Sequence, residues 1–189
     1  MNTRASACAP KTQALVLVGF MGAGKSSVGN ILGRRLNWPF EDLDDRIQRR
    51  DGRSIEQIFA ESGEAFFRQA EHQALREMVA ESGENPRVVA LGGGAFAQPE
   101  NIALLQEAGA LTVFLDGPVE ELFERCQAQK VQRPLQKDRQ LFRKLYEDRR
   151  SHYMRATLCV DTSAKDVESV ASEIAKALGL DGQYEKNRR

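Results

Sequence analysis

The chain has 189 residues, 41% of them hydrophobic, and its 27 basic side chains balance 27 acidic ones. This length suits one compact domain with a substantial core and is short for two. A formal net charge of zero argues against general attraction to nucleic acid or to an anionic membrane, so any anion binding must be local. We expect a single domain over residues 13–180, with a disordered extension at 1–12 and a flexible tail at 181–189.

The three cysteines, Cys8, Cys126 and Cys159, have no metal-ligand spacing, and their odd number argues against a disulfide framework. No apolar run approaches the roughly 20 residues of a membrane-spanning helix. The first residues also lack the apolar core of a signal peptide. These features favour a cytoplasmic protein, and nothing in the sequence demands a dimer, so a monomer is expected.

Short runs rich in Val and Leu alternate with longer helical stretches. Continuous hydrophobicity is typical of strands covered on both faces, as in a parallel sheet between two helical layers. The expected strands are 15–18, 39–41, 88–91, 111–115 and 158–160. The expected helices are 25–36, one opened by a capping box at 54–57, 64–81, 99–107 and 167–178. We therefore predict a three-layer α/β/α fold around a central five-stranded parallel sheet.

Residues 19–26, Gly-Phe-Met-Gly-Ala-Gly-Lys-Ser, follow the first expected strand and precede a helix. This is the Walker A pattern in the context that the motif requires. Glycine lets the backbone approach phosphate oxygens with its amides pointing inward, and the following helix adds its positive N-terminal end. Lys25 can then reach the β- and γ-phosphates, while the Ser26 hydroxyl can ligate Mg²⁺. The motif predicts nucleotide binding but does not define the reaction.

Two strand ends carry candidate functional carboxylates. Asp116 follows the fourth expected strand, where motors and switches have a Walker B acid. Asp42 and Asp44 follow the second, and in extended chain both project to the same side. One could hold Mg²⁺ directly or through water, and the other could accept a proton from, or orient, an acceptor hydroxyl. Alternatively, Asp44 or Asp45 caps a short helix.

Gly92, Gly93 and Gly94 follow the third expected strand, at the sheet edge where open α/β folds bind ligands. A small polar ligand could approach this backbone closely, although a plain flexible turn is the alternative. Arg68 suits a carboxylate acceptor because its guanidinium matches two oxygens. A surface ion pair between Arg68 and Glu71, one helical turn beyond, is the alternative.

The segment from Arg125 to Arg155 differs in charge from the rest of the chain. It carries ten basic and three acidic residues, a local net charge of +7 by that count. In a neutral protein the segment is a candidate anion-facing element, and a solvated helix face is the alternative.

Together these motifs resemble the shikimate kinase family, small P-loop kinases of the nucleoside-monophosphate-kinase type. The resemblance extends from about residue 15 to about residue 162. It implies a P-loop NTPase fold with a mobile lid at about 127–139. It also implies ATP-dependent phosphorylation of the 3-hydroxyl of shikimate, giving shikimate 3-phosphate and ADP on the route to the aromatic amino acids. Its markers are Gly19–Ser26, Asp42-Leu43-Asp44, Ser54–Phe59, Gly63–Arg68 with Glu71, Gly92–Gly94, Arg133-Pro134-Leu135, and Arg149 four residues before Tyr153.

The resemblance assigns roles to individual residues. Asp44, Lys25 and Arg133 form the catalytic set, with Asp44 at the shikimate hydroxyls as candidate base and Arg133 reaching the transferring phosphate from the lid. Ser26 and Asp42 match the Mg²⁺ site, Asp42 through water. ATP is held by Gly22, Ala23, Gly24, Lys25, Ser26, Ser27, Arg125 and Arg133, with Arg125 the candidate for packing on adenine.

On the acceptor side, the resemblance assigns Arg68 and Arg149 to the shikimate carboxylate and the three glycines to backbone contacts. Phe59 and Phe67 wall the pocket for the ring. Ser151-His152 replaces the family's Pro-Leu before Tyr153, which leaves Arg150 as an alternative to Arg149. Asp116 falls outside the family's catalytic set and is interpreted as a strand-end or loop acid.

Two other functions stay open on sequence alone. A gluconate-type small-molecule kinase would share the scaffold, whereas Arg68, Arg149 and the triple glycine favour shikimate. A non-catalytic nucleotide-binding regulator would use Asp116 as its Walker B acid and have no acceptor chemistry.

Overall fold

The computed structural model describes residues 13–83, 85–128 and 138–180. Five strands form one sheet in the order β2-β3-β1-β4-β5, and every neighbouring pair is parallel. The strands are β1 (Ala14–Val18), β2 (Phe40–Asp42), β3 (Arg87–Ala90), β4 (Leu111–Asp116) and β5 (Leu158–Asp161). The helices are α1 (Lys25–Leu36), α2 (Leu43–Asp51), α3 (Ile55–Glu81), η1 (Ala95–Ala97), α4 (Pro99–Ala108), α5 (Val119–Gln127), α6 (Arg139–Tyr153) and α7 (Val167–Ala177).

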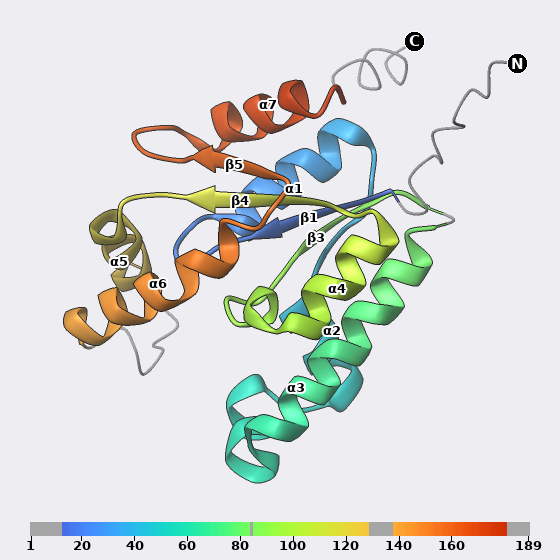
Figure 1. Ribbon diagram of the computed structural model, residues 1–189, viewed down its shortest axis with the longest axis vertical. Coiled ribbons are helices and arrows are strands. Elements are labelled where there is room, and N and C mark those ends of the chain that lie inside the picture. The colour runs from blue at the N-terminus through green and yellow to red at the C-terminus, as the bar shows by residue number, and fades with distance from the viewer. Residues whose placement is uncertain (1–12, 84, 129–137, 181–189) are drawn as a thin grey trace, which may run out of the picture.

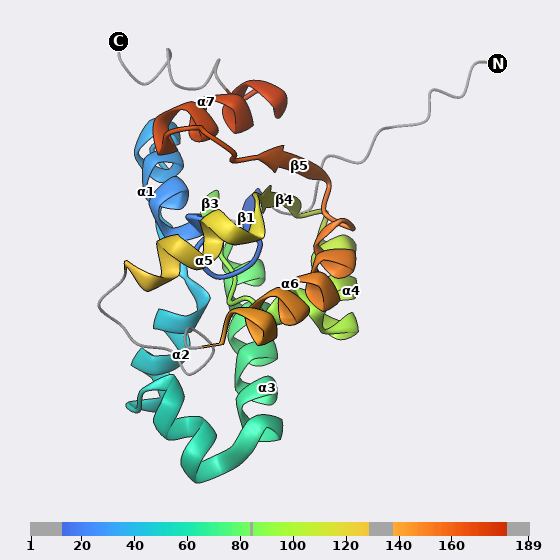
Figure 2. The same ribbon diagram turned by 90° about the vertical axis from the view of Figure 1, so that its left-hand side faces the viewer.

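The sheet lies between two helical layers (Figures 1 and 2). Helices α1 and α7 pack together on one face, while α4 and α6 lie on the other, with α3 packed against α4. Each residue of the central strand β1 is at most 1% exposed, as expected for a strand covered on both faces. The predicted three-layer α/β/α fold with five parallel strands is therefore confirmed.

The local signals for the helices are confirmed with one exception. Ser54 Oγ accepts from the Gln57 amide at 3.2 Å and Gln57 Oε1 from the Ser54 amide at 2.8 Å, so the capping box opens α3. Gly63, with φ 79° and ψ 175°, breaks α3 between the two helices expected from the sequence. The exception is α2, which is capped by Asp42 rather than by Asp44 or Asp45.

Because all five strands are parallel, their carboxyl ends share one edge of the sheet. The P-loop, defined as residues 19–26, follows β1; Asp42 ends β2; and the triple glycine follows β3. Open α/β sheets bind ligands along this edge. The fold thus gathers segments that are up to about 70 residues apart in the sequence.

Some expected features lie outside the described residues: the terminal segments 1–12 and 181–189, Arg133, and the lid apart from residues 127, 128, 138 and 139. Within the described ranges, no helix is both long enough and apolar enough to cross a membrane.

Candidate active site

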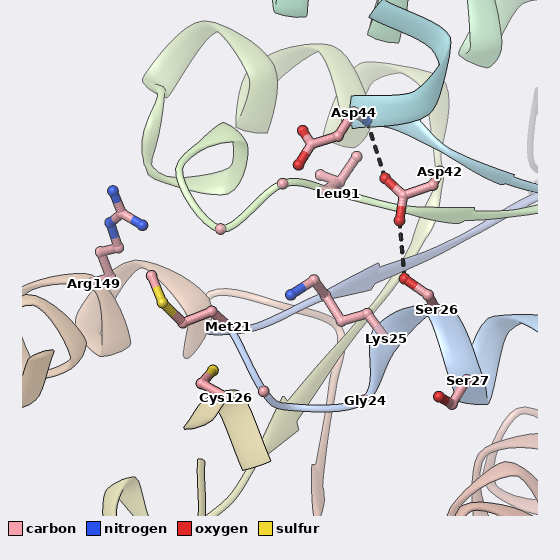
Figure 3. Close-up of a pocket in the computed structure, with 13 residues that line it drawn as sticks. Met21, Gly24, Lys25, Ser26, Ser27, Asp42, Asp44, Leu91, Cys126 and Arg149 are labelled. Atoms are coloured by element: carbon pink, nitrogen blue, oxygen red, sulfur yellow. Dashed lines mark hydrogen bonds between the residues drawn. The ribbon is translucent and has the colours of Figure 1, made fainter. Parts of the chain in front are cut away.

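A cavity of about 180 Å³ lies at the carboxyl edge of the sheet, between the P-loop, the start of α2 and the loop after β3 (Figure 3). All of its lining residues except Met21, Leu91 and Cys126 were assigned to the site from sequence. The lining consists of Met21, Gly22, Gly24, Lys25, Ser26, Ser27, Asp42, Asp44, Leu91, Gly92, Gly93, Cys126 and Arg149.

The P-loop presents the N-terminus of α1 to this cavity. Gly24 is the N-cap residue and has φ 86°, a left-handed conformation that side-chain-bearing residues rarely adopt. No side chain among the described residues caps α1, so its first amides are suited to hold an anion. Lys25 Nζ donates to the carbonyls of Gly19 at 2.9 Å and Phe20 at 3.0 Å, which holds its charge across the loop. The loop is therefore built to bind phosphate.

Ser26 and Asp42 form a pair of oxygen ligands beside Lys25. Ser26 Oγ donates to Asp42 Oδ2 at 3.0 Å, and Asp42 Oδ1 accepts from the Asp44 amide at 3.0 Å. Hydroxyl and carboxylate oxygens suit Mg²⁺, which typically takes one or two carboxylates and completes its shell with phosphate and water. Within the described residues there is no group of three or more His, Cys, Asp or Glu side chains that could hold a metal. Ser26 and Asp42 together supply one hydroxyl and one carboxylate, which fits the small number of protein ligands that Mg²⁺ typically takes.

The triple glycine makes room for three side chains from three different helices. The distances from a Cβ added at each glycine are 2.6 Å from Gly92 to Asp44 Oδ1, 3.3 Å from Gly93 to Arg149 Nη1, and 2.9 Å from Gly94 to Arg68 Nη1. Any larger residue would displace these groups. The three glycines are therefore explained by close packing, and not only by the flexibility of a turn. The loop brings together the residues that the sequence assigned to the acceptor hydroxyl and carboxylate.

Arg68 pairs with a buried acid rather than at the surface. Its Nη1 donates to Glu71 Oε2 at 2.8 Å and its Nη2 to Glu64 Oε1 at 3.1 Å, and Glu71 is 1% exposed. Burial raises the pKa of Glu71, and the Arg68 charge opposes this rise. Burial alone would lower the pKa of Arg68, but the two carboxylates reverse this effect and raise it. The pair between Arg68 and Glu71 therefore exists, as the alternative expected. The expectation that this pair lies at the surface is wrong, because Glu71 is buried.

Helix α6 separates the two adjacent arginines that the sequence left as alternatives. Arg149 lines the cavity, and its guanidinium lies 6.0 Å from the centre of the Phe20 ring. Arg150 Nη2 instead donates to Asp116 Oδ2 at 2.6 Å. The structure thus supports Arg149 as the cavity residue. Asp116 is therefore bonded to helix α6, whereas the P-loop serine, Ser26, donates to Asp42.

Phe59 and Phe67 stack next to Arg68. Their ring centroids are 4.6 Å apart, and the Arg68 guanidinium lies 5.2 Å from the Phe67 ring. Phe67 is buried and Phe59 is 38% exposed, and neither belongs to the cavity lining that the described residues form. Arg125 forms an ion pair with Glu121 at 3.0 Å and is likewise outside the lining.

The sequence assigned no role to several residues at the cavity. Met21, Leu91 and Cys126 line it, and the Tyr153 hydroxyl donates to the Gly93 carbonyl. Met21 lies inside the Walker A pattern, so its position was a usable signal. Cys126 follows Arg125 directly, and only the rotation of α5 decides which of these neighbours faces the cavity.

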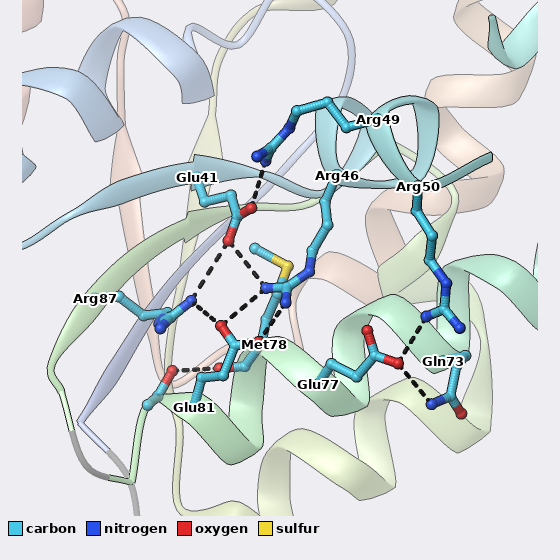
Figure 4. Close-up of polar contacts among 10 residues, drawn as sticks. Glu41, Arg46, Arg49, Arg50, Gln73, Glu77, Met78, Glu81 and Arg87 are labelled. Atoms are coloured by element: carbon cyan, nitrogen blue, oxygen red, sulfur yellow. Dashed lines mark hydrogen bonds and ion pairs between the residues drawn. The ribbon is translucent and has the colours of Figure 1, made fainter. Parts of the chain in front are cut away.

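An ion cluster fixes α2, the helix that carries Asp44, to the sheet edge and to α3 (Figure 4). The cluster is defined by Glu41, Arg46, Arg49, Glu81 and Arg87. Arg46 Nη1 donates to Glu41 and to Glu81, each at 3.1 Å, and Arg87 Nη1 donates to Glu81 at 2.7 Å. Arg49 completes the cluster by donating to Glu41. Three guanidinium groups thus share two carboxylates, linking β2, β3, α2 and α3.

Comparison with known proteins identifies the family of this chain. The sequence model of the shikimate kinase family matches residues 21–179. Shikimate kinase from Geobacter sulfurreducens is 44% identical over 164 residues, which cover 85% of this chain and 88% of that protein.

Two solved structures of shikimate kinases are also similar. Shikimate kinase from Aquifex aeolicus has a TM-score of 0.73 at 39% identity, with 88% of this chain and 96% of that chain covered. Shikimate kinase from Acinetobacter baumannii, solved in complex with shikimate, has a TM-score of 0.80 at 32% identity, with 89% and 94% covered. The predicted family and activity are confirmed. The chain belongs to the shikimate kinase family, whose members use ATP, and its function is shikimate kinase activity.

Proposed function

We propose that the chain transfers the γ-phosphoryl group of ATP to the 3-hydroxyl of shikimate, using the residues gathered at the cavity. The observation that carries this proposal is that Asp44 and Arg149 line the same cavity as Lys25. A phosphate-binding lysine, a carboxylate and a guanidinium in one cavity suit transfer from a nucleotide to a hydroxyl on a carboxylated molecule.

On the donor side, the α1 amides and Lys25 bind the phosphates and stabilise the charge that spreads over the transferring group. Ser26 and Asp42 would hold Mg²⁺, Asp42 through water. When bound there, Mg²⁺ would supply positive charge to neutralise the phosphate oxygens. Gly22, Ala23, Gly24 and Ser27 shape the loop around the phosphates, and Arg125 packs on adenine.

On the acceptor side, Asp44 accepts the proton of the 3-hydroxyl or orients that hydroxyl toward the phosphorus. Its place at the second residue of α2 holds the carboxylate beside Gly92. Arg68, beside Gly94, and Arg149, beside Gly93, bind the shikimate carboxylate through charge-assisted hydrogen bonds. The backbone of Gly92, Gly93 and Gly94 supplies further contacts to shikimate.

Phe59 and Phe67 form an apolar wall beside Arg68, and the Arg68 guanidinium already lies over the Phe67 ring. Arg133, in the lid outside the described residues, contacts the transferring phosphate and helps exclude water as the lid closes. We further propose a cytoplasmic monomer acting on shikimate, with no nucleic acid or membrane partner. Light scattering on the purified chain would measure its mass in solution.

The test is an assay of ADP formation with shikimate, gluconate and a nucleoside monophosphate as separate acceptors. We expect ADP formation to depend on shikimate, and equal turnover with either other acceptor would refute the proposed substrate. Asp44→Asn separates a kinase from a nucleotide-binding regulator. It should abolish transfer and leave ATP binding, measured by calorimetry, within about twofold, because no Asp44 contact is proposed for the nucleotide.

A further inference from the structure

Asp116 anchors helix α6 at the end of β4. Its Oδ1 accepts from the Tyr146 hydroxyl at 2.7 Å, and its Oδ2 accepts from Arg150 Nη2 at 2.6 Å. The Asp116 side chain is 16% exposed. Charge-assisted hydrogen bonds, such as that from a guanidinium to a carboxylate, are stronger than neutral ones. A single side chain thus holds two residues of α6, one helical turn apart.

The anchor itself is fixed in the sheet. The Asp116 carbonyl accepts from the amide and the hydroxyl of Thr162, at 2.7 and 2.8 Å. Its Oδ1 also accepts from the amide of Gly117 at 3.0 Å. These bonds tie Asp116 to the ends of β4 and β5, so the carboxylate has a defined position from which to hold α6.

The Tyr146 hydroxyl is suited to remain a donor in this arrangement. Burial, together with the hydrogen bond to Asp116, raises the pKa of Tyr146 to about 12. The hydroxyl therefore keeps its proton throughout the pH range in which a cytoplasmic enzyme is assayed. The Tyr146 ring also packs against the ring of Phe20 in the P-loop, with centroids 5.5 Å apart.

The position of Arg149 follows from the rotation of α6 about its axis. Consecutive residues of an α-helix lie about 100° apart around the axis, so Arg149 and Arg150 point in different directions. Phe20 contacts α6 at Tyr146 and also at Phe142, with a centroid distance of 4.9 Å. With these contacts on one side and Asp116 holding Arg150, Arg149 is directed at the cavity and at Gly93.

We propose that Asp116 is a positioning residue for shikimate, because it fixes the rotation of α6 and thereby directs Arg149 at the cavity. The inference rests on the role proposed above for Arg149 at the shikimate carboxylate. The inference thus gives a function to Asp116, the acid at the Walker B position. Asp116 has no role in the phosphoryl transfer proposed above.

A double-mutant cycle tests the inference. We would measure kcat/KM for shikimate and KM for ATP in the wild type, Asp116→Ala, Arg149→Ala and the double variant. Asp116→Ala should lower kcat/KM for shikimate by about tenfold, because a misdirected binding group loses its alignment. KM for ATP should stay within about twofold, and in the Arg149→Ala background the same change should have no more than about a twofold effect.

Equal losses in both backgrounds would show that Asp116 does not act through Arg149, and would overturn the inference while leaving the role of Arg149 intact. If Arg149→Ala alone left shikimate kinetics unchanged, the proposed role of Arg149 and the inference would both fail. The two failures are therefore distinguishable.

A second variant covers the case in which Asp116→Ala does not fold. Tyr146→Phe combined with Arg150→Gln removes both donors and keeps the aromatic ring, and should show the same dependence on Arg149. The matched control is Arg143→Gln, on the same helix, which breaks only an exposed pair with Glu120. Its shikimate kinetics should match the wild type, and a loss as large as that of the double-donor variant would refute a specific role for Asp116.

Discussion

Arg68 and Glu71, one turn apart on α3, form an ion pair at 2.8 Å whose acid is almost completely buried. Because charge is costly in a buried site, the Glu71 carboxylate depends on the guanidinium beside it. The same guanidinium lies against Gly94, where the shikimate carboxylate is proposed to bind. Arg68 therefore has two functions, in stability and in binding, and experiments can separate them.

The first prediction concerns stability against pH in Arg68→Ala. Burial already raises the pKa of Glu71 above its usual value of 4.5, and removing Arg68 should raise it further. The folded state then binds more protons than the unfolded state, so the free energy of unfolding should fall as pH rises above about 4.5. Urea titrations at several pH values would measure this slope, and a slope equal to that of the wild type would contradict it.

The control for that prediction is the double variant Arg68→Ala/Glu71→Gln. It removes the buried charge and should flatten the added pH dependence. Shikimate affinity should nevertheless stay weakened by about 3 kcal/mol, as expected when one partner of a desolvated charge pair is lost. Unchanged affinity in both variants would refute the proposed contact with the shikimate carboxylate.

A second prediction concerns Mg²⁺ and Asp42→Asn. Asparagine is also a good N-cap, so α2 should stay folded while the negative oxygen beside Ser26 is lost. The Mg²⁺ concentration for half-maximal ADP formation should rise by on the order of tenfold. Asp45→Asn, three positions along the chain and exposed, is the control and should not change it. Equal behaviour of the two variants would argue against Asp42 as a metal-site residue.

A third prediction concerns Gly92→Ala. The added methyl would lie 2.6 Å from Asp44 Oδ1, the end of a flexible side chain, so Asp44 should move while the backbone stays in place. A displacement of about 1 Å should lower kcat about 100-fold. Gly179→Ala, at a left-handed residue after α7, should instead cost about 1 kcal/mol of stability and leave kcat unchanged. Comparable kcat values for the two variants would contradict the steric argument.

A fourth prediction concerns the ion cluster. The hydrogen bond from Arg46, with the charges of Arg46 and Arg87, lowers the pKa of Glu81 below its usual value, so Glu81 stabilises the folded state above about pH 4.5. This contribution is lost as pH falls through the lowered pKa. Glu81→Gln should therefore lower stability at pH 7 by about 1 kcal/mol, an upper value for a partly exposed pair that solvent screens.

The matched control for the cluster is Glu77→Gln, one turn earlier on α3. Glu77 pairs with Arg50, whose side chain is 53% exposed, and accepts from Gln73 Nε2 at 2.9 Å, so a smaller loss than that of Glu81→Gln is expected. Thermal melts at pH 7 and at low pH would compare the two variants. A loss in Glu81→Gln that persisted at low pH would point to packing rather than charge as its cause.

Much of the site could be predicted because its signals are local. The Walker A pattern needs only a strand, a glycine-rich turn and a helix in sequence, and the capping box at Ser54 needs four residues. Continuous apolar runs predicted the parallel sheet because strands covered on both faces need no polar side chains. The order of the motifs identified the family. The metal, lid and individual residue roles stay predictions.

The sequence by itself determined the fold class, the phosphate loop and the family. Only the tertiary structure decided that Arg149 faces the cavity while Arg150 pairs with Asp116, and that each glycine after β3 accommodates a side chain from a different helix. Adjacent arginines are equivalent in local pattern. Their directions depend on how α6 is rotated against β4 and the P-loop, and that rotation is set by packing between residues about 30 to 130 positions apart.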